Sequence, residues 1–228
     1  MLRIIIQSAF LTVLTLFGGL ALGTAVGFWV FESLPGHSTL SPSALHISLA
    51  ALPAFAGFWG GSAVWGILMG RMAGSAETRR MALAGMLGFA PITLVLGIGL
   101  SAVEPFVIEQ IGALFPIHRI FTLMFAPSAF LIAGLSAWAL GRGLRSKALA
   151  WKLLWQVSGA AALAFLVVNL VMEFSGWVVG GPNAAERYTM LTVMFLGNFG
   201  TALAGGALLG VMLTPLAQST HTASRSPV

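Results

Sequence analysis

Six long stretches of the chain contain no Asp, Glu, Lys, Arg or His. They cover residues 4–31, 47–70, 81–103, 120–141, 153–172 and 188–214. The shortest has 20 residues, and a helix needs about 20 apolar residues to cross a bilayer. Because hydrocarbon offers the backbone no hydrogen-bond partner, a stretch that lies in a membrane must be helical. The sequence therefore predicts an all-α integral membrane protein with six transmembrane helices.

The composition also indicates lipid as the solvent of this surface. Of the 228 residues, 58% are hydrophobic and only 7% are charged, against about 25% charged residues in a soluble domain. The chain has no cysteine, which excludes disulfides and thiolate metal sites. The first uncharged stretch is much longer than the apolar region of a signal peptide, about 7–15 residues. We therefore expect it to be a retained first helix.

The basic residues predict the orientation of the helices. If the N-terminus is cytoplasmic, nine of the eleven basic residues lie on the inner side and only two, Arg119 and Arg187, lie outside. This bias predicts cytoplasmic N- and C-termini, in a bacterial-type inner (plasma) membrane. The inner basic rim is expected to contact anionic lipids, and no nucleic-acid partner is predicted. Its members are Arg3, Arg71, Arg79, Arg80, Arg142, Arg145, Lys147, Lys152 and Arg225.

A threefold repeat is visible in the spacing of the charged residues. An acid follows each odd-numbered span, and a histidine or arginine comes 14 positions later. The pattern predicts three helical hairpins, at about residues 4–71, 81–142 and 153–214, in one domain over residues 1–215. Residues 216–228 are predicted to be a disordered cytoplasmic tail. The pairs are Glu32 with His46, Glu104 with His118, and Glu173 with Arg187.

The three repeated acids are candidate path residues. In a pseudo-symmetric bundle, Glu32, Glu104 and Glu173 would form a ring at the outer mouth of a path. Asn169 lies four residues before Glu173, on the same helix face, and Asn198 lies in the last span. Both are expected deeper along the path. The alternative is that polar residues merely end the helices at the level of the lipid headgroups.

Two histidines give a second hypothesis, which involves a cofactor. His46 and His118 occupy matched repeat positions, so they are expected at matched depth. Two such side chains can ligate a haem from both sides, and one alone can ligate a chlorophyll. The alternative is a pair of solvated interfacial histidines. The sequence predicts no other metal site.

Glycines recur at four-residue steps in several spans. Gly19, Gly23 and Gly27 form one series, and Gly57 with Gly61 forms another. Small residues at this spacing let helices approach closely in lipid, either within one chain or between subunits. Packing within the chain is the expected use.

The sequence predicts a non-enzymatic function. There is no P-loop, HExxH or dinucleotide-binding motif. Ser136 lies 18 residues from His118, about 27 Å along one helix, which is too far for a catalytic pair. The spans carry no mid-membrane charge of the kind that ion-coupled transporters use. We expect a channel or facilitator for a neutral or weakly polar solute. The alternatives are a non-catalytic subunit of a larger respiratory or photosynthetic complex and a subunit that binds haem or chlorophyll.

Overall fold

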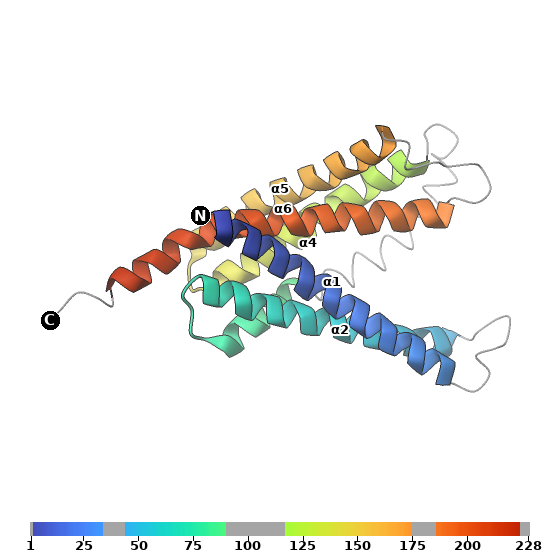
Figure 1. Ribbon diagram of the computed structural model, residues 1–228, viewed down its shortest axis with the longest axis horizontal. Coiled ribbons are helices and arrows are strands. Elements are labelled where there is room, and N and C mark those ends of the chain that lie inside the picture. Colours follow the sequence, from blue (N-terminus) through green and yellow to red (C-terminus); the bar gives the residue numbers. More distant parts are fainter. Residues whose placement is uncertain (1, 34–43, 90–116, 175–185, 224–228) are drawn as a thin grey trace.

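A computed structural model describes residues 2–33, 44–89, 117–174 and 186–223, and this part of the chain is helical without strands. A short helical segment covers residues 78–89. Figure 1 shows the arrangement of the helices. The five labelled helices are α1 (Leu2–Ser33), α2 (Ala44–Met72), α4 (Ile117–Gly143), α5 (Lys147–Phe174) and α6 (Glu186–Ala223).

Four of these helices are long and apolar enough to cross a membrane. Their spanning parts are Leu2–Ser33, Leu52–Met72, Lys147–Phe174 and Phe195–Leu216. They coincide with four of the six predicted spans. The span predicted at 120–141 lies within helix α4, and the span predicted at 81–103 belongs to the described residues only as far as residue 89. The all-α fold is confirmed.

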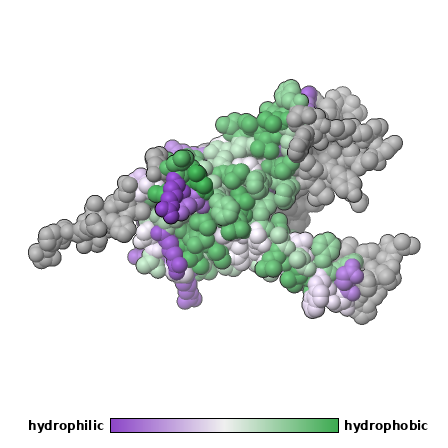
Figure 2. Space-filling model, in the orientation of Figure 1, coloured by the Kyte–Doolittle hydropathy of each residue, from purple (hydrophilic) through white to green (hydrophobic). Residues whose placement is uncertain are grey.

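The bundle exposes many large apolar side chains, and its largely apolar core also holds several small polar ones. Leu2, Ile6, Phe10 and Leu14 form an exposed stripe along α1. Figure 2 shows a largely hydrophobic surface over the middle of one face, with strongly hydrophilic residues near the N-terminal end. So many exposed large apolar side chains are unusual for a soluble protein and fit contact with lipid. The buried polar residues are Ser8, Thr12, Ser62, Thr122, Ser128, Ser136, Ser158 and Asn169.

Most contacts join helices that follow one another in the chain, and the last helix, α6, also packs against the first. Helix α1 packs against α2 and α6, and α5 packs against α4 and α6. Segment 78–89 joins α2 to α4, since Gly85 faces Ser62 and Gly88 faces Ser136. Helices α2, α4 and α6 also contact one another, whereas α1 and α5 share no contact among their described residues. The even-numbered helices therefore meet one another, whereas the described parts of α1 and α5 do not.

Glycines make the closest helix contacts, as the four-residue steps predicted. Gly57 of α2 packs on Gly19 and Gly23 of α1, and a Cβ on Gly57 would lie 2.8 Å from the Gly23 Cα. On α6, a Cβ at Gly206 would lie 2.9 Å from the Ala9 Cα of α1. No side chain larger than hydrogen fits at these positions without a shift of the backbone. Packing within the chain is confirmed for these glycines.

One end of the bundle, here called the basic end, is tightly closed. It holds the start of α1, the end of α2, the end of α4 and the start of α5. Toward the opposite, far end, α1 and α2 diverge from α4, α5 and α6 (Figure 1). Large apolar side chains fill the core of the basic end: Met69, Met81, Leu140, Leu153 and Leu213. Its basic residues include Arg3, Arg71, Arg80, Arg142 and Lys147.

Two chain reversals at the basic end have the same geometry. After α2, the Ser75 amide donates to the Gly70 carbonyl at 2.8 Å, and after α4 the Ser146 amide donates to the Gly141 carbonyl at 3.2 Å. This bond across six residues is the helix-ending Schellman pattern. Each serine side chain then accepts a backbone N–H at the start of the next helix.

The two reversals differ at the left-handed residue. Gly74 has φ 82° in the first reversal, and Arg145 has φ 60° in the second. A side chain in this conformation costs about 1–2 kcal/mol because Cβ approaches the following carbonyl. Glycine avoids this cost, so Arg145 is the more strained of the two.

Helix α6 continues beyond the predicted end of its span. It reaches Ala223 with Pro215 inside it, so part of the segment predicted to be a disordered tail is helical. Proline removes only one backbone donor, and the helix can resume on its C-terminal side. Residues 224–228 of the predicted tail lie outside the described residues.

Candidate functional site

A buried amide on α5 has an acceptor atom without a partner. The Asn169 side chain is only 4% exposed, and its Nδ2 donates to the Phe165 carbonyl at 2.8 Å. Its Oδ1 has no hydrogen-bond partner within the described part of the chain. Reversing the amide would place Oδ1 against the Phe165 carbonyl oxygen, so this orientation is the favourable one. An orphaned buried acceptor costs about 1–3 kcal/mol.

Helix α6 faces this amide with a glycine. A Cβ at Gly197 would lie 2.7 Å from the Asn169 Nδ2 and 2.6 Å from the Phe165 Cδ2. Nearer the basic end, the Thr201 hydroxyl donates to the Ala161 carbonyl at 3.1 Å and joins the same two helices. Asn198 follows Gly197 and is partly exposed. The amide therefore lies directly at the interface of α5 and α6.

One turn further along α5, a carboxylate is paired with an arginine. Glu173 Oε1 accepts Nε of Arg119 at 2.8 Å and its Nη2 at 2.5 Å. The side chain of Glu173 is 17% exposed and that of Arg119 is 55% exposed, so the pair forms a rim above Asn169. The hydrogen bond to Glu173, with its negative charge, raises the pKa of Arg119. Arg119 therefore remains a cation at any physiological pH.

Arg119 is a residue that the sequence analysis did not include in the site. The repeat pattern associated Glu173 with Arg187, whose side chain lies outside the described part. Among the described side chains, Arg119 of α4 contacts Glu173. The available sequence signal was its position directly after His118, at the start of an even-numbered span.

The three repeated acids are placed differently. Glu32 lies near the end of α1 and is exposed, whereas Glu104 is outside the described residues. The ends of α1 and α5 diverge (Figure 1), so the structure does not bring Glu32 to Glu173. It does bring Asn169 and Glu173 to one face of α5, beside the backbone of α6.

The two histidines of the cofactor hypothesis lie on separate helices. His46 is in the first turn of α2 and His118 is in the first turn of α4. Their side chains lie outside the described part of the chain. Among the described residues, no three His, Cys, Asp or Glu side chains come together as a metal site.

The described site offers hydrogen-bond acceptors on one helix face. The Asn169 carbonyl is buried, and the Glu173 carboxylate lies about one turn nearer the rim. A small molecule with N–H or O–H groups matches both atoms. Comparisons with protein-family models, with curated proteins and with solved structures found no match to this chain.

Proposed function

We propose that the chain crosses a bacterial-type inner membrane six times, with the basic end and both termini in the cytoplasm. Helix α4 has 27 residues, or about 40 Å of helix, and the hydrocarbon core is about 30 Å thick. The clustering of arginine and lysine at one end supports the orientation. Anionic lipids are the proposed partners of this basic rim.

The three-hairpin repeat is part of the same proposal. Its support is the shared geometry of the reversals at Gly70–Ser75 and Gly141–Ser146, which occupy corresponding places in the first two hairpins. The contacts of α2, α4 and α6 with one another are also what three equivalent hairpins would produce.

The proposed activity is non-enzymatic passage of a small neutral or weakly polar solute. Glu32, Glu104 and Glu173 are assigned to the outer mouth, and Asn169 and Asn198 to deeper positions. The observation that carries this assignment is the buried Oδ1 of Asn169, which has no hydrogen-bond partner among the described residues. An unsatisfied buried acceptor persists at a cost in stability, and a passing N–H or O–H group would satisfy it.

Replacing Asn169 with leucine tests this role. We expect flux of urea and glycerol into proteoliposomes to fall about two- to tenfold, the effect of one hydrogen bond of 0.5–1.5 kcal/mol. The melting temperature is expected to stay level or rise, because the orphaned acceptor disappears. Stopped-flow light scattering and thermal unfolding measure the two quantities.

Thr201→Val is the matched control for this interface. It removes the hydroxyl that joins α6 to the Ala161 carbonyl, so the melting temperature should fall while flux stays near that of the parent. If Asn169→Leu leaves flux unchanged, the assignment of Asn169 to the path is wrong.

The mouth assignment has its own test with Glu104→Gln and Glu173→Gln. Each variant replaces a carboxylate with a neutral amide. Glu173→Gln also removes the negative charge that pairs with Arg119. We expect the flux, or its dependence on pH, to change in both variants. Unchanged flux with an unchanged pH profile would exclude these acids from the mouth.

One observation favours the alternative of a non-catalytic subunit in a respiratory or photosynthetic assembly. Gly18, Gly60 and Gly159 have no heavy atom near the position of a Cβ, so another membrane helix could approach there. Native purification separates the two functions, because a subunit would co-migrate with a large complex. A visible spectrum of that preparation tests for haem or chlorophyll at His46 and His118.

A further inference from the structure

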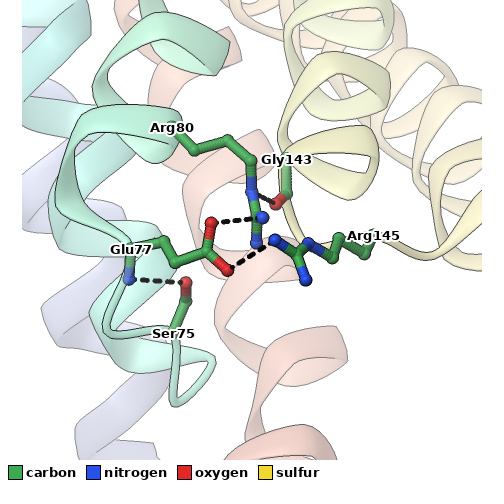
Figure 3. Close-up of polar contacts among 5 residues, drawn as sticks. All are labelled: Ser75, Glu77, Arg80, Gly143 and Arg145. Carbon is green, nitrogen blue, oxygen red and sulfur yellow. Dashed lines mark hydrogen bonds and ion pairs between the residues drawn. The ribbon is translucent and has the colours of Figure 1, made fainter.

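The two chain reversals at the basic end are tied together by one carboxylate. Figure 3 shows Glu77 between two arginines. Its carboxylate pairs with Arg80 on the next helical turn and with Nη2 of Arg145, which is 3.1 Å away on the other reversal. Arg80 also donates its Nε to the Gly143 carbonyl at 2.5 Å. These contacts join the start of segment 78–89 to the end of α4.

The backbone of Arg145 indicates that its side chain has a role. The matching position in the first reversal is Gly74, the residue type that this conformation favours. A strained backbone at a non-glycine residue persists where another interaction compensates for it. The one cross-reversal contact that the structure assigns to the Arg145 side chain is the ion pair with Glu77.

The contacts of Glu77 with Arg80 and Arg145, here called the tie, lie over the closed core of the basic end. Directly beneath the tie, the buried Met81 packs between the two sides. A Cβ at Gly70 would lie 3.0 Å from the Met81 Cε, and a Cβ at Gly143 would lie 3.2 Å from its Sδ. Separation of segment 78–89 from α4 would break the tie and expose Met81.

The ion pairs of the tie are weak, as expected for a contact that breaks and re-forms. The side chains of Glu77 and Arg145 are 45% and 74% exposed, and exposed ion pairs contribute little to overall stability. A weak contact can still shift a balance between two states of similar free energy. Far from the tie, the rings of Phe17 on α1 and Phe195 on α6 are in contact, 5.4 Å between centroids. Helices α1 and α6 are therefore held together away from the tie as well.

We propose that Glu77, Arg80 and Arg145 form a latch that holds the basic end closed and opens as segment 78–89 moves away from α4. Its effect on solute flux rests on the proposed function, whereas the opening itself does not.

Thiol labelling tests the opening independently of transport. The chain has no cysteine, so Met81→Cys provides a single buried reporter under the latch. In inside-out vesicles, adding Arg145→Gly or Glu77→Gln should raise the labelling rate about two- to fivefold, the effect expected from losing one exposed ion pair. Arg145→Gly also relieves the left-handed backbone, so its melting temperature should not fall. Faster labelling then reports opening and not unfolding.

Arg142→Gln is the matched control for charge. It removes one positive charge from the same helix end, but Arg142 lies over the Trp138 ring, with 5.9 Å to the centroid, and not on Glu77. Labelling at Met81→Cys should stay at the parent rate in this variant. The latch is wrong if Arg145→Gly and Glu77→Gln label no faster than Arg142→Gln.

A reversible bridge tests the effect of the latch on flux. In the double variant Glu77→Cys with Arg145→Cys, a bifunctional thiol reagent that reduction cleaves should lower urea and glycerol flux, and reduction should restore it. Flux that the bridge leaves unchanged would overturn the latch. If the parent itself carries neither solute while Arg145→Gly still speeds labelling, the latch stands and the proposed function fails.

Discussion

Replacing Gly57 with alanine is expected to destabilise the bundle by about 3 kcal/mol, the upper part of the range for overpacked cores. A Cβ at this position would overlap the Gly19 carbonyl and lie 2.8 and 2.9 Å from the Cα and N of Gly23. These neighbours are backbone atoms, so relief requires α1 and α2 to separate along their length. Thermal unfolding in detergent should show a melting temperature roughly 6–12 °C lower.

Gly60→Ala is the matched control on the same helix. A Cβ at Gly60 meets nothing within 4 Å, and alanine is the better helix former by about 0.5–1 kcal/mol. The melting temperature of this variant should therefore stay level or rise. Equal effects at positions 57 and 60 would show that helix propensity, and not close packing, determines the result.

Trp65→Ala is expected to cost about 3–5 kcal/mol, as large-to-small changes of buried aromatic residues do. The Trp65 side chain is buried in the core of the basic end. Its ring also packs edge-on against Phe89 at 5.0 Å between centroids. The cavity would lie where α1, α2 and segment 78–89 meet. The melting temperature should fall by roughly 6–20 °C, and a fall of only 1–2 °C would contradict this packing.

Two smaller substitutions at the contact of Trp65 with Thr12 should lower the free energy of unfolding for different reasons. Trp65 Nε1 donates to the Thr12 hydroxyl at 3.1 Å, and that hydroxyl donates to the Ser8 carbonyl at 2.8 Å. Trp65→Phe removes the donor and leaves Thr12 bonded, whereas Thr12→Val leaves a buried indole N–H without a partner. The lost hydrogen bond should therefore cost about 1 kcal/mol more in Thr12→Val than in Trp65→Phe, whereas Trp65→Phe also has the cost of the cavity that the smaller ring leaves.

The sequence predicted the features that depend on local composition. Uncharged runs placed α1, α2, α5 and α6, because length and polarity alone decide whether a helix can lie in lipid. Glycine spacing also predicted close packing of helices within the chain, because close approach in lipid requires small residues at four-residue steps; which glycines face each other, such as Gly19 and Gly57, came from the structure. Asn169 and Glu173 were predicted on one face of α5 by the period of the helix, and the structure agrees.

Contacts between distant segments could not be predicted in the same way. Glu173 could be assigned to an end of the bundle, but its partner Arg119 lies 54 residues away in sequence, and the repeat pattern associated Glu173 with Arg187, the other arginine expected at that end. The ion pair of Glu77 with Arg145 depends on a left-handed residue that sequence periodicity does not reveal. Only the comparison of the two chain reversals shows that arginine occupies a position suited to glycine.

The seam between α1 and α6 has a consequence for how the protein is made. At 5–20 residues per second, a ribosome takes about 10–40 s to synthesise the roughly 200 residues between Ser8 and Gly210. During that delay, α1 has to remain in the membrane without its last neighbour. The hydroxyls of Ser8 and Thr12 are bonded to carbonyls of their own helix, so the nascent α1 carries these polar groups already satisfied while it waits.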